Sequence, residues 1–158
     1  MKSSNSYAII KCDTILEQIT WEKCTLRTWL NSTFLKKAFS IDEQKAVVAT
    51  DVDNRRIQCN SSWSSNGGNN TRDKIFLLSY MEVEKYFGSD DSRICKPTEF
   101  AIAQGLKADD SGNCSWLLRS PGASQDSASG VISPGSIGYC IDVNHASGVR
   151  PVLWIHLE

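Results

Sequence analysis

The chain has 158 residues, a net charge of −1 from 17 basic and 18 acidic side chains, and a hydrophobic fraction of 41%. This length predicts a single domain over residues 1–158 that buries a sizeable core without cross-links. The near-zero charge gives no electrostatic basis for binding nucleic acid. No run of residues approaches the roughly 20 apolar positions that span a bilayer.

The N-terminal residues 1–10 contain a lysine but only a very short apolar run, which is not the pattern of a secretory signal. The compartment is therefore left open. Either the protein is cytoplasmic, or this sequence starts downstream within a longer parent protein.

The six cysteines are scattered, and none forms the Cys-x-x-Cys spacing of a zinc site. We therefore expect no metal site from them. A chain with this much core does not need disulfides, so we expect most thiols to be reduced and to pack as small apolar groups. The cysteines stand at positions 12, 24, 59, 95, 114 and 140.

The first half of the chain predicts helices. A short strand is expected over residues 7–10. Apolar residues recur every three or four positions from Trp21 to about Phe39, the period of one helical face. Residues 31–33 (Asn-Ser-Thr) have low helix propensity, so one helix and two kinked helices fit equally. Ser40 is expected to cap a further short helix.

A long polar loop and a second helix follow. The β-branched run 46–50 predicts a strand. Residues 51–73 are rich in Asn, Ser and Gly, which predicts a long surface loop of the kind that often carries function. Residues 73–79 predict the next strand. Ser79 is then expected to cap a short helix over residues 80–87.

The second half predicts one helix and a group of strands. Residues 97–106 have Pro and Thr at the start and a Gly near the end, the start and stop signals of a helix. Strands are expected over residues 115–119, 131–132, 137–143 and 150–157. Helices first and strands late favour an α+β domain, with two main helices packed on a twisted, mostly antiparallel sheet.

Four segments occur in an order that resembles a bacterial domain family of unknown function. The resemblance covers residues 14–158 and implies an extracellular or phage-related context. It also implies a distant similarity to the C-type-lectin-like fold of formylglycine-generating enzymes. Family members begin with an extra pair of strands, so the resemblance implies a domain truncated at its N-terminus. The segments are residues 21–31, 73–79, 116–122 and 148–155.

Two of these segments each place an arginine, Arg119 or Arg150, in an apolar strand-like run. A buried guanidinium must be paired or hydrogen-bonded. In one interpretation both are structural and pair with carbonyls or with a carboxylate such as Glu22, Asp126 or Asp142. Arg27 is interpreted in the same way, as a scaffold arginine on an aromatic face.

In the other interpretation, the two arginines line a ligand cleft with polar residues from the following loop. An exposed tryptophan in the loop 51–73 would add a stacking surface. The candidate ligand-binding residues are Trp63, Trp116, Arg119, Ser120, Gln125, Asp126 and Arg150.

Catalytic signals are sparse. His145 and His156 belong to no triad or metal motif, and no nucleophile elbow, phosphate loop or dinucleotide fingerprint is present, so we expect no cofactor. Asp51, Asp53 and Asn54 cluster oxygens but do not match a calcium loop. Glu82 and its neighbour Glu84 point apart on a helix, which is unsuited to paired acid–base work.

The leading hypothesis is a non-enzymatic binding or surface-display module that acts through loops 51–73 and 120–135 on a carbohydrate or protein ligand. One alternative is an enzyme of formylglycine-generating type, which would need Cys95 and Cys140 to meet in a groove. Another is an accessory domain of a larger extracellular or phage protein.

Overall fold

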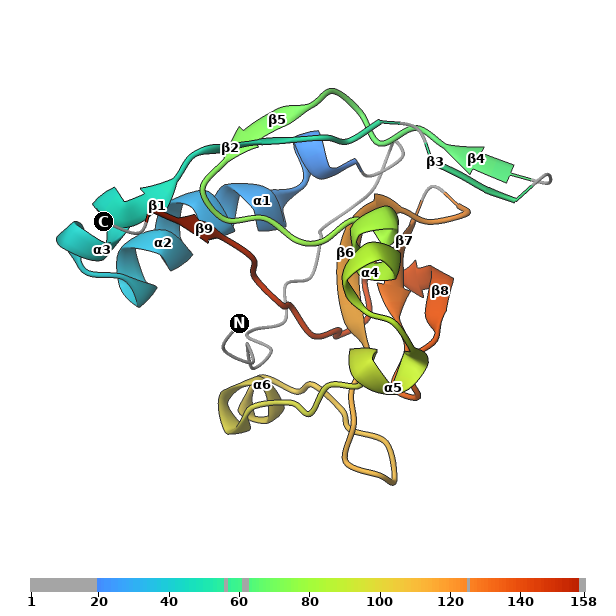
Figure 1. The fold of residues 1–158 in the computed structure, drawn as a ribbon. Coiled ribbons are helices and arrows are strands. Elements are labelled where there is room, and N and C mark those ends of the chain that lie inside the picture. The colour runs from blue at the N-terminus through green and yellow to red at the C-terminus, as the bar shows by residue number, and fades with distance from the viewer. Residues whose placement is uncertain (1–19, 56, 61–62, 125, 157–158) are drawn as a thin grey trace.

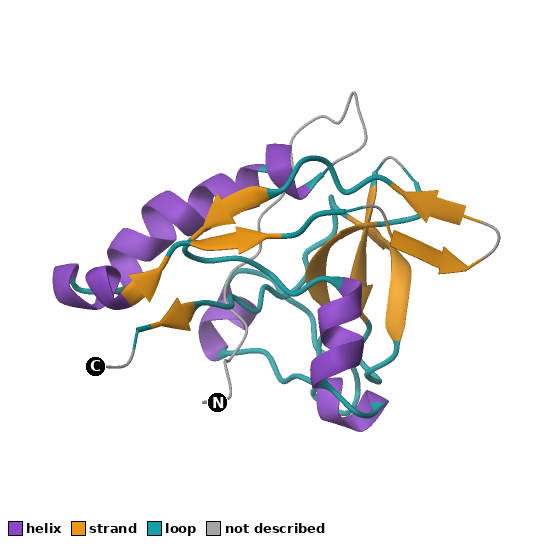
Figure 2. Cartoon of the chain, turned by 45° about the horizontal axis from the view of Figure 1, so that its top comes forward, coloured by secondary structure: helices purple, strands orange, loops and turns teal. Residues whose placement is uncertain are grey.

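The chain forms a mixed α and β structure of short helices and small antiparallel sheets in a computed structural model (Figures 1 and 2). The strand predicted over residues 7–10 lies outside the described residues. None of the helices in the described part of the chain has the length and apolar character needed to cross a bilayer. The structure describes residues 20–55, 57–60, 63–124 and 126–156, with backbone alone for 57–60 and 63–65.

The helices are short, and several begin at a polar cap. The predicted caps Ser40 and Ser79 are confirmed: each accepts a hydrogen bond from the backbone N–H of the glutamate three residues on, which bonds back to the cap's own N–H. The helices are α1 (Thr25–Trp29), α2 (Leu35–Ala38), α3 (Ile41–Ala46), α4 (Tyr80–Tyr86), α5 (Asp90–Arg93) and α6 (Glu99–Ala103), with a 3₁₀ turn over Trp21–Lys23.

The helix predicted from Trp21 onward is continuous from Thr25 to Ala38, as its single-helix alternative predicts, but it changes to π-helical geometry in the middle (Figure 2). A π-helical turn over Leu30–Phe34 joins α1 to α2. In this turn the Asn31 side chain donates to the carbonyl of Ile75 at 2.8 Å and accepts from the N–H groups of Lys74 and Ile75 at 2.8 and 3.1 Å. Through Asn31, the π-helical turn therefore holds the backbone of residues 74–75 against the helix.

The strands of the described residues pair in four antiparallel groups: β1 with β9, β2 with β5, β3 with β4, and β6–β7–β8. The strands are β1 (Val47–Val48), β2 (Thr50–Val52), β3 (Ile57–Asn60), β4 (Trp63–Ser65), β5 (Thr71–Asp73), β6 (Trp116–Pro121), β7 (Ser127–Val131), β8 (Ile137–Asp142) and β9 (Trp154–Ile155).

Two sequence predictions about strands were wrong in part. The segment 51–73 is not one long loop, because most of it folds back on itself as the β2–β5 pair, which lies alongside the helices, and the β3–β4 pair, which projects from it (Figure 1). We call segment 51–73 the arm. Because the segment is polar throughout, its sequence lacks the alternation of apolar and polar residues that predicts a half-buried strand. The closing strand β9 pairs with β1 and not with β8. Before the chain reaches β9, Gly148 forms a parallel bridge with Trp116 at the start of β6.

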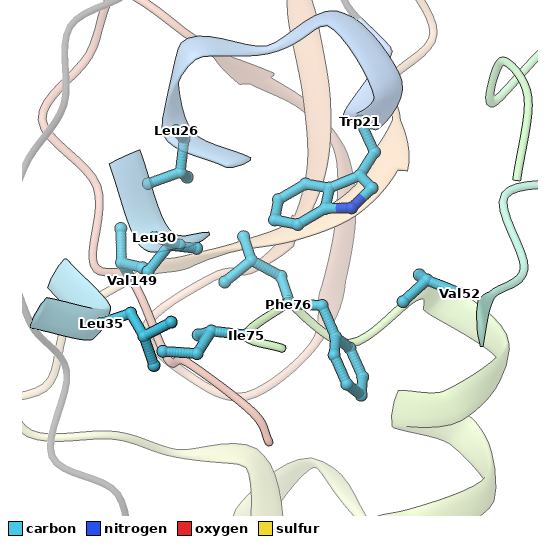
Figure 3. Close-up of a cluster of buried hydrophobic side chains, with 9 residues drawn as sticks. Trp21, Leu26, Leu30, Leu35, Val52, Ile75, Phe76 and Val149 are labelled. Atoms are coloured by element: carbon cyan, nitrogen blue, oxygen red, sulfur yellow. The ribbon is translucent and has the colours of Figure 1, made fainter. Parts of the chain in front are cut away.

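Two main hydrophobic clusters lie on either side of β6. The larger joins the helical run 25–38 to segment 75–77 (Figure 3), and the smaller lies between α4 and the three-stranded sheet. Successive residues of a strand point to opposite faces. Trp116 and Leu118 accordingly belong to the α4 cluster, whereas Leu117 packs against the helical cluster. Arg119 is two positions after Leu117 and so points to the same face of β6. Its guanidinium lies 5.8 Å from the centre of the Phe76 ring.

A buried ionic node anchors the helical half. The Asp73 carboxylate, at the end of β5, is 2% exposed and accepts three hydrogen bonds. They come from Arg27 Nε at 2.8 Å, Trp21 Nε1 at 2.9 Å and the Thr71 hydroxyl at 2.7 Å. Arg27 is thus a scaffold residue as predicted, although its partner is a carboxylate instead of an aromatic face. We call these four residues the Asp73 node.

Candidate functional site

A cavity of about 280 Å³ lies where the arm, the start of α4 and the end of β6 meet. The arm contributes residues 53–55 and Gly67, the helix contributes residues 79, 81 and 82, and the strand contributes residues 119–121. These three parts are distant in sequence and come together only in the fold. We call this space the arm cavity.

Arg119 forms the buried wall of the arm cavity. Its side chain is 3% exposed and pairs with the Glu82 carboxylate through Nη1. Nη1 also donates to the Leu77 carbonyl at 2.7 Å, and Nη2 donates to the Asp53 carbonyl at 3.1 Å. Its Nε–H is buried and has no hydrogen-bond partner among the described residues. Among the three nitrogens of this guanidinium, Nε is therefore the one without a partner among the described residues.

Glu82 is held in place by the helix cap. Its carboxylate accepts from the Ser79 backbone N–H at 2.7 Å while it pairs with Arg119. Burial alone would raise the pKa of Glu82, but the hydrogen bonds from Arg119 and Ser79 outweigh burial and lower the pKa below its ordinary value. Glu82 is therefore an ionised partner at neutral pH and is not free to act as a base.

Asn54 forms the wall contributed by the arm. It is 6% exposed, and its side-chain NH₂ donates to the Asn69 carbonyl at 3.0 Å and to the Thr71 hydroxyl at 3.3 Å. Its Oδ1 is buried and, within the described part of the chain, accepts no hydrogen bond. Gly67 packs directly on this residue, since a Cβ there would come within 2.0 Å of the Asn54 carbonyl oxygen. Only glycine allows so close an approach.

An exposed ion pair closes the rim of the cavity. Arg55 Nη2 lies 2.5 Å from Asp53 Oδ2, and both side chains are accessible to solvent. Hydrogen bonds from Arg55 lower the pKa of the Asp53 carboxyl and keep it ionised. The cavity therefore has two acidic and two basic residues, arranged as two ion pairs, and its formal charge is zero.

The second predicted arginine lies in a different place. Arg150 packs over the Trp116 ring at 4.5 Å and over the Phe87 ring at 5.5 Å. The carbonyl of Arg93 accepts from Trp116 Nε1 at 3.1 Å and from Arg150 Nη1 at 3.5 Å. Both arginines donate to carbonyls, as the structural interpretation predicts. The carboxylates suggested for them were wrong, because Arg119 pairs with Glu82 and Arg150 stacks on aromatic rings.

The remaining predicted site residues are dispersed. Ser120 lines the arm cavity beside Arg119, although its hydroxyl already accepts from the Tyr80 N–H at 3.0 Å. Asp126 lies on an exposed turn and accepts from the Ser124 hydroxyl at 2.8 Å. Gln125 and the side chain of Trp63 lie outside what the structure describes. Of the seven candidates, the arm cavity brings together Arg119 and Ser120.

Three residues of the arm cavity were not predicted as ligand contacts, although the sequence carried a signal for each. Glu82 stands at the third position after the cap Ser79, where a capping glutamate turns toward the start of the helix. Asp53 and Asn54 were noted as an oxygen cluster. Their carbonyl and amide groups in fact form part of a polar wall, and no group of three or more His, Cys, Asp or Glu side chains within the described ranges is placed to hold a metal.

Comparison with protein families places the chain in a domain family of unknown function. A family model described as a domain of unknown function (DUF6273) matches residues 5–157. The chain belongs to this family, which confirms the predicted resemblance to a domain family of unknown function. No match was found among curated proteins. The search of solved structures also gave no match.

Proposed function

We propose that this domain is a non-enzymatic binding module and that the arm cavity holds a polar group of its carbohydrate or protein ligand. One observation carries the proposal: Arg119 and Asn54 both line this cavity, and each has a buried polar side-chain atom, Nε–H and Oδ1, without a partner in the described residues. Buried polar groups are almost always hydrogen-bonded, so two exceptions at one cavity mark a place where a ligand completes the set.

The charges of the cavity support binding over catalysis. A general base or acid needs a pKa near the working pH and freedom to exchange a proton. The pKa values of Asp53 and Glu82 are both lowered by arginine partners. Neither carboxylate is suited to proton transfer at neutral pH, whereas both fix the orientation of the guanidinium groups beside them.

The position of the cavity also agrees with a ligand-binding site formed by loops. It lies between segment 51–73 and the start of segment 120–135, the two regions that the sequence favours for ligand contact. We infer that the domain is a variant of the C-type-lectin-like architecture, in which a small sheet supports long, variable segments. Binding through such segments does not depend on the catalytic cysteine pair that the enzyme alternative requires.

The test is a glycan and protein-partner screen with the full chain and two variants of α4. Met81 is 59% exposed and lines the cavity, so Met81→Trp fills the entrance without disturbing the core. Tyr86 is 45% exposed on the same helix and does not line the cavity, so Tyr86→Trp is the matched control.

We expect wild type and the Tyr86→Trp variant to bind the same ligand and the Met81→Trp variant to lose at least tenfold in affinity. Equal binding by all three proteins would place the site elsewhere. The absence of any ligand across broad glycan and protein panels would overturn the binding function itself.

A further inference from the structure

We propose that Asn66 is a site of spontaneous deamidation, at which the side chain loses ammonia and the arm acquires an isoaspartate. Of the asparagines in the chain, Asn66 is the one that a glycine follows directly. The inference rests on this pair of residues and on the contacts around it. It does not depend on what the arm cavity binds.

The reaction joins a backbone nitrogen to the side chain of the residue before it. The Gly67 nitrogen gives up its proton and attacks Cγ of Asn66, and the side-chain amide leaves as ammonia, so that a five-membered imide closes. Water then opens the imide at either of its two carbonyls, which gives aspartate or isoaspartate. A Cβ on the attacking residue would crowd the nitrogen as it approaches Cγ, and glycine has none.

The local structure exposes Asn66 and polarises its side-chain carbonyl. Residues 66–68 belong to no helix or strand, and Asn66 is exposed, so water reaches the amide. Its Oδ1 accepts from the Gly68 N–H at 3.1 Å, in a turn where Gly68 has a φ of 83°. Negative charge develops on this oxygen when the nitrogen attacks, and the N–H donor is already in place to stabilise it.

Two other exposed asparagines show what the Asn66 site adds. Asn144 lies in a turn, but it precedes His145, whose side chain crowds the attacking nitrogen. Asn69 precedes another asparagine, and its side-chain NH₂ donates to the Glu22 carboxylate at 2.9 Å, which fixes the amide in place. Exposure alone therefore does not define the site, and the glycine that follows Asn66 does.

An isoaspartate at position 66 changes the base of the arm. It carries the main chain through the former side chain and so adds a methylene group between residues 66 and 67. Gly67 has no room for a longer chain, because even a Cβ there would come within 2.0 Å of the Asn54 carbonyl oxygen. The wall that Gly67 and Asn54 form in the arm cavity must therefore shift. The neutral amide also becomes a carboxylate, which adds a negative charge to the arm.

The test is to incubate the full, folded chain at mildly alkaline pH and to follow each asparagine by peptide mass spectrometry. An isoaspartyl methyltransferase, which methylates isoaspartate, labels the product. Asn66→Gln removes the site, because glutamine would have to close a larger ring. Asn144→Gln, in the other exposed turn, is the matched control. A parallel incubation in urea gives the rate in the unfolded chain.

We expect Asn66 to lose its amide before any other asparagine of the folded chain, and faster as pH rises, since the attacking nitrogen must lose its proton. The methyl label should appear on wild type and Asn144→Gln and be absent from Asn66→Gln. The backbone amide NMR signals of Asn54 and Arg55 should shift in the incubated wild type and stay unchanged in incubated Asn66→Gln.

Two results would overturn the proposal. If Asn66 stays intact in the folded chain under conditions in which it reacts in urea, the fold blocks the reaction. If Asn144 reacts as fast as Asn66 in the folded chain, neither the glycine nor the turn at Gly68 directs it. Loss of the Asn66 amide without any methyl label would contradict the isoaspartate and, with it, the shift in the cavity wall.

Discussion

The Asp73 node and the arm cavity both bury an ion pair, but they differ in how completely their polar atoms are used. At Asp73, both carboxylate oxygens accept hydrogen bonds, and the partners come from the 3₁₀ turn, α1 and β5. At Arg119, the guanidinium binds Leu77, Asp53 and Glu82, yet its Nε–H has no partner in the described chain. At Asp73 both oxygens have partners, whereas at Arg119 the buried Nε has none among the described residues.

This difference separates a structural role from a binding role at two sites of similar composition. A buried charge whose hydrogen bonds are all made holds the surrounding elements in place and has no free donor or acceptor for a ligand. A buried charge with one unsatisfied donor beside a cavity keeps part of its bonding capacity for a partner. The comparison predicts that the Asp73 node matters mainly for stability and that Arg119 matters for stability and binding together.

The largest effect is expected for Asp73→Ala. This change leaves the Arg27 guanidinium, the Trp21 indole N–H and the Thr71 hydroxyl without their common partner. We expect the free energy of unfolding to fall by about 3–5 kcal/mol, measured by urea denaturation. The control is Asp51→Ala, which removes an exposed pair with Arg72 at 3.2 Å and should cost less than about 1 kcal/mol. Equal losses in the two variants would show that the node is not structural.

A smaller loss is expected for Glu82→Gln. The amide oxygen can still accept from Ser79 and Arg119, but the buried guanidinium loses its counter-charge. We expect about 2 kcal/mol of lost stability, since hydrogen bonds to charged groups contribute about 1.5–3 kcal/mol. Glu84→Gln, on the same helix and exposed, should change stability by less than about 0.5 kcal/mol. If the Glu82→Gln protein were as stable as wild type, the ion pair between Glu82 and Arg119 would not contribute to the stability of the fold.

Acid pH should remove the same contribution. The pKa of Glu82 is lowered in the folded protein from an ordinary value of 4.5. A lowered pKa stabilises the fold above the ordinary value, and the gain is lost as pH falls through the folded-state pKa. The difference in unfolding free energy between wild type and Glu82→Gln should therefore be constant from pH 7 to about 5 and shrink below about 4.5. A difference independent of pH down to 3 would contradict the ion pair.

The smallest effect is expected for Arg150→Leu. Its guanidinium packs over Trp116 and Phe87 and makes one long hydrogen bond to Arg93, so its loss should cost about 1 kcal/mol. Lys85→Leu, which removes an exposed contact of the same kind at 5.4 Å from the Tyr86 ring, is the matched control with an effect below about 0.5 kcal/mol. Ligand binding should be unchanged in both, because neither residue lines the arm cavity.

The local elements were largely predictable because their signals are local. The caps Ser40 and Ser79, the helix after Thr98 and the strand over β8 follow from residues within a few positions of one another. The pairing of β9 with β1 depends on contacts more than a hundred residues apart. No periodicity within either two-residue strand contains that information.

The candidate site was predictable only in part for the same reason. An arginine in an apolar strand must find partners, so Arg119 stood out in the sequence. Its carboxylate could not be chosen from the sequence, because Glu82 is 37 positions away and reaches Arg119 through the orientation of α4. The arm is harder still, since the position of Asn54 over the cavity depends on a glycine contact that has no sequence period.

The hydrogen bonds of Asn31 have a consequence for the order in which the protein is made. The helical turn that contains this residue is held by the backbone of Lys74 and Ile75, which are synthesised 43 and 44 positions later. At roughly 5–20 residues per second, the ribosome delivers those groups about 2–9 s after Asn31 itself. Until then the π-helical turn lacks the partner that defines it. The helix therefore acquires these three hydrogen bonds only after the segment that completes the core has been synthesised.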